Sequence, residues 1–369
     1  MKIIIRKKDR VLNQEAFLVL LTDFIKDTAA GRRTKSNGSL ISHSTVENYI
    51  HMKRLVQNFS KQSTFEIKLY LVNNLNQAEK ENAHKYYRKL YIAFTNYMYD
   101  DLNYFDNYVG NVIKCLKAFF NYLIKERSIE IGNYHRLFYV PHEEIPIIAL
   151  NREQLNYVIN NATFKRKVKE NDLEVVRDVF IFGCTVALRV SDLLTLSPKN
   201  LVIRDNKHYI QVKSQKTKKN TVIKLPDYCV TILRKYKGKQ ETLLPSCSLF
   251  SFNSKLKKMA TLFPDNFELV KTREKRGKQI VIYKNPKLKT HYKLSDHMSS
   301  HVMRRTGITT MLNLGMPEYM VRRISGHTAN SKEFFRYVQL SQNLVDKETD
   351  RVFEQLAMKN NVKVENRKQ

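Results

Sequence analysis

Three side chains between residues 300 and 338 could together act on a phosphodiester. His301 and Arg304 are three positions apart, so a helix would project both from one face. A guanidinium can hold two phosphate oxygens at once, and a neutral imidazole can accept a proton near neutral pH. Tyr337 follows among aromatic and basic residues, and its hydroxyl could attack phosphorus where cations stabilise the phenolate. The stretch therefore predicts a phosphate clamp followed by a phenol nucleophile.

Each of these residues also has a plainer interpretation. An isolated His-x-x-Arg pattern is common and usually marks a core histidine beside a surface arginine. The chain contains 20 tyrosines, most of which must pack or lie on the surface. His297 and His301 have the four-residue spacing of a zinc-binding helix, but Met298 stands where a metalloprotease helix carries its glutamate base. We expect no metal and no cofactor.

The charge of the chain indicates the class of partner. Lys and Arg number 65 against 35 Asp and Glu, which gives a net charge of +30. Such an excess attracts polyanions, above all nucleic acid; a ribosome-associated protein or a merely soluble basic surface is the alternative. The four cysteines are scattered without a metal-binding spacing, which fits a reducing compartment. No stretch has the quality of a signal peptide or a membrane span, so we expect a cytoplasmic, nucleoid-associated protein without membrane contact.

The elements that must position these residues fall into two regions. In the first, apolar residues recur at helical spacing in stretches near 13–25, 44–59, 77–97 and 103–125. Ser44 is the expected N-cap of the second stretch, and 64–72 is ambiguous between strand and helix. Pro141 and Pro146 break the periodicity between residues 139 and 151, which predicts an extended connector.

The second region mixes helices with a small sheet. Helical patterns cover about 152–161 and 173–188, and β-branched runs in 201–225 predict a small antiparallel sheet. A further hairpin is expected over 267–283, with its turn in EKRGK. The remainder is expected to be helical, including a helix that starts near Pro317 and ends at Gly326 as its C-cap.

Five stretches resemble, in order, the motifs of the tyrosine recombinases, the phage integrase family: FGCTVALRVSDLLTL, QKTKKNTVIKL, SHVMRRTGITT, ISGHT and FFRYV. The resemblance covers the whole second region and, more weakly, residues 15–59. It implies a mainly α fold with a small antiparallel β-sheet (α+β), in which a helical, SAM-like core-binding domain precedes a catalytic domain. The expected boundaries are an extension at 1–12, a core DNA-binding domain at 13–140, a linker at 141–151, the catalytic domain at 152–343 and a tail at 344–369.

The resemblance implies a catalytic role for each matching residue. Arg189 and Arg304 match the arginines that stabilise the reacting phosphate. His327 matches the histidine that donates a hydrogen bond to that phosphate. His301 matches the residue that assists the phenol, and Tyr337 matches the nucleophile.

The resemblance implies roles for two further residues, and one of them has alternatives nearby in the sequence. Lys216 matches the lysine that acts as general acid for the leaving 5′-oxygen, with Lys213, Lys218 and Lys219 as alternatives. Asp192 matches an acidic residue that supports the site rather than reacting.

The sequence departs from the family pattern in two places. Val186 and Ala187 replace the usual threonine and glycine, which should alter a turn without removing the arginine that follows. Tyr337 lies ten residues after His327, whereas nine is usual, and position nine is Arg336. We interpret the difference as one inserted loop residue.

The function implied by the resemblance is site-specific recombination through a 3′-phosphotyrosyl intermediate, without ATP or metal. The expected partners are double-stranded DNA, a homotetramer on two DNA sites and, in some systems, accessory DNA-bending proteins. Integration or excision of a mobile element is the first choice; DNA inversion, chromosome-dimer resolution, a relaxing topoisomerase and a catalytically inactive regulator are the alternatives. The amphipathic pattern within the tail predicts a helix that docks on a neighbouring protomer or on its own domain.

Overall fold

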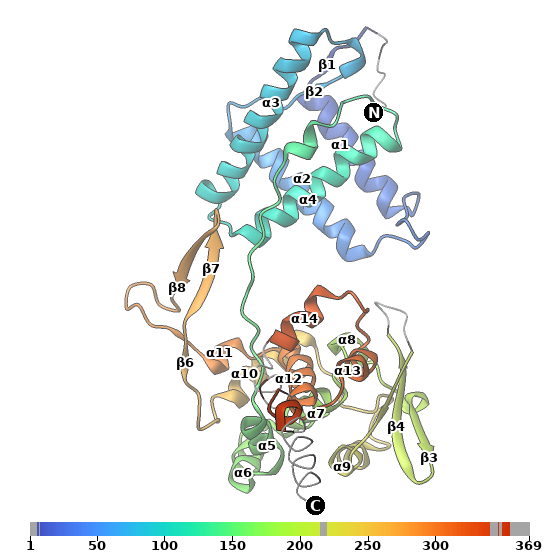
Figure 1. The fold of residues 1–369 in the computed structure, drawn as a ribbon, viewed down its shortest axis with the longest axis vertical. Helices are drawn as coiled ribbons and strands as arrows, with labels where there is room; N and C mark the ends of the chain where they lie inside the picture. Colours follow the sequence, from blue (N-terminus) through green and yellow to red (C-terminus); the bar gives the residue numbers. More distant parts are fainter. Residues whose placement is uncertain (1–5, 7, 215–219, 340–345, 347–348, 355–369) are drawn as a thin grey trace, which may run out of the picture. The chain divides into compact units, whose positions relative to one another are not determined.

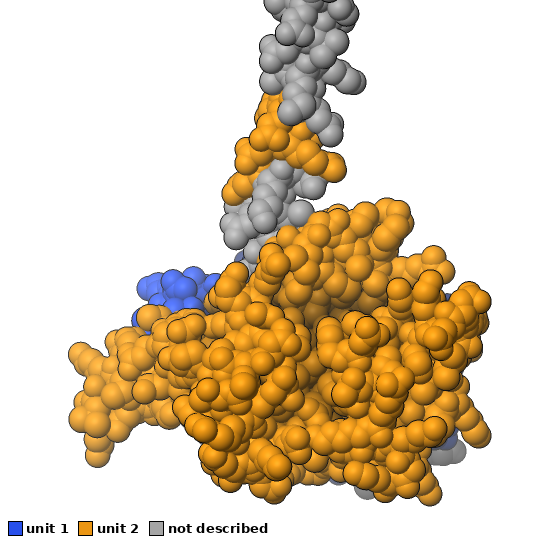
Figure 2. All heavy atoms as spheres, turned by 90° about the horizontal axis from the view of Figure 1, so that it is seen from below, with its two compact units in different colours: residues 1–145, 272–282 blue, residues 146–271, 283–369 orange. Residues whose placement is uncertain are grey.

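The computed structural model divides the chain into two compact units (Figures 1 and 2). Unit 1 comprises residues 1–145 and 272–282, and unit 2 comprises residues 146–271 and 283–369. The structure describes residues 6, 8–214, 220–339, 346 and 349–354. Lys216 and most of the expected tail helix therefore lie outside the described residues.

Unit 1 is built on helices at the positions that the apolar periodicity predicts. They are α1 (Gln14–Ala29), α2 (His43–Gln62), α3 (Gln77–Asn96) and α4 (Asp106–Lys125). Their buried faces meet in an aromatic core in which the Phe17 and Phe24 rings contact the Phe119 ring at 5.2 and 5.7 Å between centroids. The prediction of Ser44 as N-cap was wrong: α2 starts two residues earlier, at His43, and Ser42 occupies the N-cap position.

Short polar signals set the ends of these helices. The Asn76 side chain accepts from the Glu79 backbone N–H, and the Glu79 carboxylate accepts from the Asn76 backbone N–H, which closes a capping box at the start of α3. A π-helical turn, η2 (Tyr97–Asp101), follows α3. The ambiguous stretch before α3 forms β2 (Leu69–Tyr70), which pairs antiparallel with β1 (Val11–Leu12), and then the 3₁₀ turn η1 (Val72–Asn74).

Unit 1 also contains the expected hairpin, β7 (Lys271–Lys275) and β8 (Lys278–Ile282), although it lies far from the helices in sequence (Figure 1). Its turn residues, Arg276 and Gly277, both adopt left-handed backbone angles, with φ of 55° and 72°. Their backbone N–H groups each donate to the carboxylate of Asp106 at 2.8 Å. Asp106, only 2% exposed, also accepts from the Tyr99 hydroxyl.

A second buried carboxylate holds the hairpin from its other side. Glu143 is 3% exposed and accepts hydrogen bonds from the Arg273 guanidinium and from the Glu274 backbone N–H. Burial raises the pKa of the Glu143 carboxyl, but these hydrogen bonds outweigh burial and leave that pKa below its ordinary value. The hairpin thus donates hydrogen bonds to two buried carboxylates of unit 1, Glu143 in the connector and Asp106 at the start of α4. These bonds make the hairpin part of unit 1.

Unit 2 is helical with a small sheet on one side. The predicted helices are present as α5 (Arg152–Asn160) and α7 (Glu174–Val186). The sheet is antiparallel, as predicted, in the order β3 (Leu201–Arg204), β4 (Lys207–Lys213) and β5 (Asn220–Lys224). A short pair, β6 (Glu268–Leu269) with β9 (Tyr292–Lys293), lies beside the hairpin in sequence.

The other helices of unit 2 are α6 (Ala162–Glu170), α9 (Asp227–Tyr236) and α10 (Leu249–Ala260), which lie in the remainder that was expected to be helical without stated bounds. The helices near the site are α8 (Val190–Leu193), α11 (Leu294–His297), α12 (Ser300–Asn313), α13 (Glu318–Ser325) and α14 (Lys332–Gln339). Two 3₁₀ turns, η3 (Tyr134–Leu137) in unit 1 and η4 (Pro198–Asn200) in unit 2, complete the named helical elements.

The helix α12 packs against α7, α13 and α14, and glycine allows its closest approach to α7. A Cβ added at Gly307 would lie 2.0 Å from the backbone carbonyl oxygen of Cys184. A Cβ at Gly183 would lie 2.6 Å from the Met303 sulfur. The helix α7, which ends shortly before Arg189, and the helix α12, which carries Arg304, therefore approach each other closely at these glycines.

Candidate active site

Arg189 is presented by a sharp turn between two helices. Ala187 ends α7 with a left-handed φ of 50°, so the turn forms here without the glycine that would adopt it at lower cost. Arg189 then has extended backbone at the N-cap of α8. Its guanidinium donates to the Ser214 hydroxyl at 3.2 Å, and that hydroxyl donates to the Asp192 carboxylate at 3.0 Å. Asp192 is 2% exposed and acts on Arg189 through Ser214, which fits a supporting rather than a reacting residue.

Arg304 lies in the middle of the site and joins two helix ends. It is 7% exposed, and its guanidinium donates to the carbonyl oxygens of Ala187 at 2.8 Å and Ser325 at 2.6 Å. These carbonyls terminate α7 and α13, where the helix dipole favours a cation. Burial, reinforced by the charge of Arg189, lowers the pKa of Arg304 to about 10, which leaves it cationic at neutral pH.

His327 follows directly after α13. Gly326 caps that helix with a left-handed φ of 67°, as the sequence predicts, and the His327 backbone N–H bonds to the Arg322 carbonyl oxygen. The imidazole Nδ1 lies 2.8 Å from the Ser325 hydroxyl, and Nε2 lies 3.2 Å from an Arg304 guanidinium nitrogen. The C-cap turn therefore brings the ring against the arginine.

Tyr337 is positioned by the last helix of the site. On α14, it is 7% exposed and packs in an apolar cluster with Phe334 and residues of α12 and α13. Its ring centroid is 6.0 Å from that of His327, and its phenolate form would raise the pKa of Arg304. Between His327 and Tyr337 the chain turns at residues 328–331 before α14 begins at Lys332, and the Tyr337 ring lies beside that of His327.

The remaining predicted catalytic residues are His301 and Lys216. His301 is solvent-exposed on the first turn of α12, one turn before the buried Arg304. Lys216 lies outside the described residues, as do its alternatives Lys218 and Lys219, while Lys213 is exposed at the end of β4.

The described residues contain no group of three or more His, Cys, Asp or Glu side chains that could hold a metal ion. His297, the other member of the zinc-like spacing, stacks near Tyr292, and burial lowers the pKa of its imidazole. The described site combines two guanidinium groups, the His327 imidazole, the Tyr337 phenol, the hydroxyls of Ser214 and Ser325 and the Asp192 carboxylate.

The sequence did not single out Ser214 and Ser325, which contact the predicted residues directly. Both are buried, at 4% and 2% exposure. Ser214 stands two positions before Lys216, and Ser325 stands two positions before His327. Closeness in sequence to a predicted catalytic residue is the feature that could have indicated these two serines.

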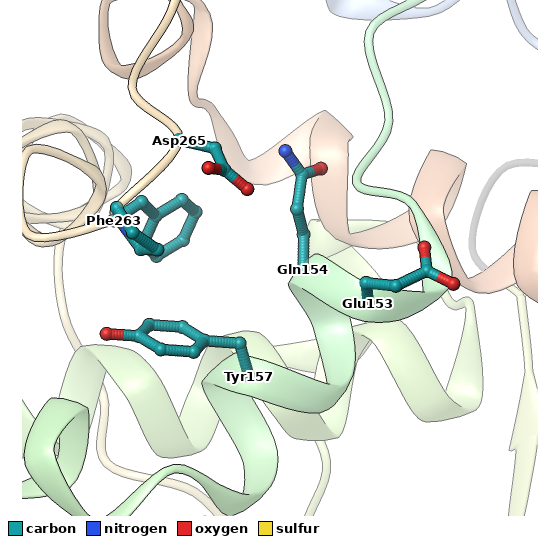
Figure 3. Close-up of a pocket in the computed structure, with 6 residues that line it drawn as sticks. Glu153, Gln154, Tyr157, Phe263 and Asp265 are labelled. Atoms are coloured by element: carbon teal, nitrogen blue, oxygen red, sulfur yellow. The ribbon is translucent and has the colours of Figure 1, made fainter.

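A separate pocket in unit 2 has a different chemistry (Figure 3). Gln154 and Tyr157 on α5 lie opposite Asp265 and Phe263, and Glu153 lines the same pocket with its carboxylate pointing away from them. Because the described residues that line it include two acids and no base, it does not suit an anionic substrate. Arg189, Arg304 and His327 lie elsewhere, at the N-cap of α8, on α12 and directly after α13.

The profile of the phage integrase family matches residues 149–343, more than half of the chain. The chain belongs to the phage integrase family. Members of this family are tyrosine recombinases, so the chain is a tyrosine-type site-specific recombinase, an enzyme of DNA breaking and rejoining. No curated protein sequence matches the chain significantly.

Solved structures of low sequence identity share the fold of this integrase family member. A lambda integrase dimer bound to a COC′ core site is 13% identical with a TM-score of 0.57, covering 89% of this chain and 78% of that one. XerH bound to a palindromic difH substrate is 12% identical with a TM-score of 0.54, covering 95% and 99%. The Tn1549 transposon integrase with a circular intermediate DNA is 14% identical with a TM-score of 0.52, covering 87% and 94%.

These structures confirm the predicted fold, mainly α with small antiparallel sheets and a helical domain before the catalytic one. Among the described residues, none of the helices is both long enough and apolar enough to cross a membrane.

Proposed function

We propose that this recombinase cuts and rejoins duplex DNA through a 3′-phosphotyrosyl intermediate formed by Tyr337. The observation that supports this most is the meeting of Arg304, His327 and Tyr337 in one site, with Arg189 close enough to act on the pKa of Arg304. Four separate motifs supply these residues, and each alone has an ordinary structural explanation.

The chemistry follows from the charges of the group. The Tyr337 oxygen attacks phosphorus and forms a P–O bond as the bond to the 5′-oxygen breaks, and that oxygen leaves as a hydroxyl after it gains a proton. Lys216 is the proposed donor of that proton, and His301 is proposed to take the phenol proton. The bond energy stays in the phosphotyrosyl link, so rejoining by a 5′-hydroxyl needs no ATP.

Arg189 and Arg304 would stabilise the charge of the pentavalent phosphorus. Both are held before substrate arrives, Arg189 by Ser214 and Arg304 by the carbonyls at two helix ends. Donors fixed in advance cost no reorganisation during reaction, and losing one costs about 3–4 kcal/mol. That arrangement favours a phosphoryl-transfer site over a merely basic surface.

Double-stranded DNA is the proposed substrate, bound by a homotetramer on two sites. The net charge of +30 supports strong phosphate contacts, and affinity should fall steeply with salt. The structures of lambda integrase include a tetramer bound to a Holliday junction, which supports the same assembly here. A cytoplasmic, nucleoid-associated location accords with that substrate.

Integration or excision of a mobile element is the proposed biological role. A lambda integrase and a Tn1549 transposon integrase among the similar structures support it, while XerH, a site-specific recombinase bound to difH, keeps inversion or resolution as the alternative. Accessory DNA-bending proteins would be needed only for some of these reactions.

The proposal is tested with a nicked suicide substrate of the cognate site, which traps a cleavage intermediate because the short cut strand diffuses away. The wild-type protein should form an adduct that survives denaturation in SDS, and Tyr337→Phe should bind the same DNA without forming it. DNA binding without an adduct in the wild type would instead indicate a regulator that has lost catalysis.

A further inference from the structure

We infer that Ser325 is a positioning residue that fixes the tautomer of His327, so that His327 donates a hydrogen bond from Nε2 only as the doubly protonated imidazolium. The inference rests on the proposed function for its consequence in catalysis. Its structural part, the tautomer, stands on the hydrogen bonds of Ser325 alone.

The Ser325 hydroxyl has one proton and two close neighbours. Its Oγ lies 2.7 Å from the Val321 carbonyl oxygen, which can only accept, and 2.8 Å from His327 Nδ1. Because the hydroxyl proton is used on the carbonyl, the second contact requires a proton on Nδ1. Ser325 is 2% exposed, so bulk water does not compete for either bond.

The position of that proton determines what Nε2 can do. A neutral imidazole has one N–H, so with Nδ1 protonated Nε2 carries a lone pair. One Arg304 guanidinium nitrogen lies 3.2 Å from Nε2 and 3.3 Å from Nδ1, so this contact does not select the tautomer, and the hydrogen bonds of Ser325 do. A phosphate oxygen accepts hydrogen bonds and offers no proton. His327 can therefore donate to the scissile phosphate only after a second proton binds at Nε2.

The charged groups around the ring make this proton uptake depend on DNA. Arg304 of α12 faces the ring, Arg189 of the α8 turn lies behind Arg304, and Arg322 of α13 stacks on Phe334, which contacts His327. An imidazolium at His327 would face these cations in the free protein. Tyr337 of α14 also faces the ring, and the phosphodiester monoanion of an arriving DNA backbone would offset the cations.

The same serine links both groups of the site. Its backbone carbonyl oxygen accepts from Arg304 at 2.6 Å while its side chain sets the orientation of His327. A substitution that removes only the hydroxyl keeps the carbonyl bond. Ser325→Ala therefore isolates the effect on the histidine.

The tautomer can be measured without any activity, by ¹⁵N NMR of the full chain with labelled histidine in its complex with duplex DNA and in the free state. The His327 signal is identified by its loss in His327→Gln. In the neutral form we expect a protonated Nδ1 and an unprotonated Nε2, and in Ser325→Ala a shift towards protonated Nε2. A wild-type ring with its proton on Nε2 would overturn the inference, whether or not the protein cleaves DNA.

The catalytic consequence is read from the pH dependence of adduct formation on the suicide substrate. In the wild type, His327 donation is present at low pH and lost as pH rises through the pKa of the DNA-bound imidazole, so the adduct rate should fall by up to tenfold per pH unit above it. Ser325→Thr, which keeps the hydroxyl, should retain this fall. Ser325→Ala should flatten it, because its neutral imidazole can carry the proton on Nε2.

The outcomes separate the two claims. If the wild type forms no adduct at any pH, the proposed function fails and the NMR result still decides the tautomer. If the wild type forms adducts and Ser325→Ala and Ser325→Thr share one pH profile, the role of the hydroxyl is refuted while the recombinase proposal stands.

Discussion

Removal of the Asp106 carboxylate should release the β7–β8 hairpin from unit 1. In Asp106→Ala, the backbone N–H groups of Arg276 and Gly277 and the hydroxyl of Tyr99 all lose their acceptor. A buried donor left without a partner costs about 1–3 kcal/mol. The two turn residues are exposed and can bind water instead, so we take the lower end for each donor, about 3 kcal/mol in total.

Hydrogen exchange of the hairpin amides measures this loss directly. A change of about 3 kcal/mol in the opening free energy corresponds to exchange faster on the order of 100-fold. Asp100→Ala is the matched control, because Asp100 also pairs with Arg276, at 2.6 Å, but its side chain is 53% exposed. A surface pair contributes roughly 0–1 kcal/mol, so that control should change exchange less than about fivefold. Equal effects of the two substitutions would refute the claim that the buried Asp106 carboxylate holds the hairpin in place.

Three further predictions concern packing, pH and the phosphate clamp. Gly307→Ala forces a Cβ to 2.0 Å from the Cys184 carbonyl oxygen, so it should lower the free energy of unfolding by about 3 kcal/mol, measured by denaturant titration of unit 2 signals. The pKa of Glu143 is lower in the folded protein than in the unfolded chain, so the ionised carboxylate stabilises the folded state above the unfolded pKa, and this stabilisation is lost as pH falls through the folded pKa. Hydrogen exchange of the hairpin amides should therefore accelerate in acid. Glu143→Gln should remove that pH dependence. Arg304→Lys keeps a charge but cannot bond two helix-end carbonyls and a phosphate together, so adduct formation should fall about 100- to 1000-fold while DNA affinity changes little.

The helices and sheets of both units were largely predictable because their apolar residues repeat at the period of the element. The bounds of α6 were not predicted, because only Phe164 and Val168 are buried in it, too few to give a periodic signal. The turn of the β7–β8 hairpin was predictable from Arg276 and Gly277, since a two-residue turn needs left-handed angles that glycine adopts freely. Its membership of unit 1 was not, because Asp106 and Arg276 are 170 residues apart.

The site residues show the same division. Arg304, His327 and Tyr337 could be proposed because the motif order of a known family ties each to a position. Ser214 and Ser325 could not, since a serine has no distinctive pattern and its role here depends on which donor and acceptor lie within about 3 Å. Hydrogen-bond partners across the fold are a property of the packed chain rather than of local sequence.

The identity of the residue bonded to DNA tests the central proposal most directly. After trapping on the suicide substrate and nuclease trimming, digestion at lysine yields the peptide 333–347, EFFRYVQLSQNLVDK, in which Tyr337 is the one tyrosine. Mass spectrometry should find the nucleotide remnant on that peptide, attached through a 3′-phosphate. A remnant on a peptide from elsewhere in the chain, or a link through a 5′-phosphate, would contradict the assignment of Tyr337 as the nucleophile.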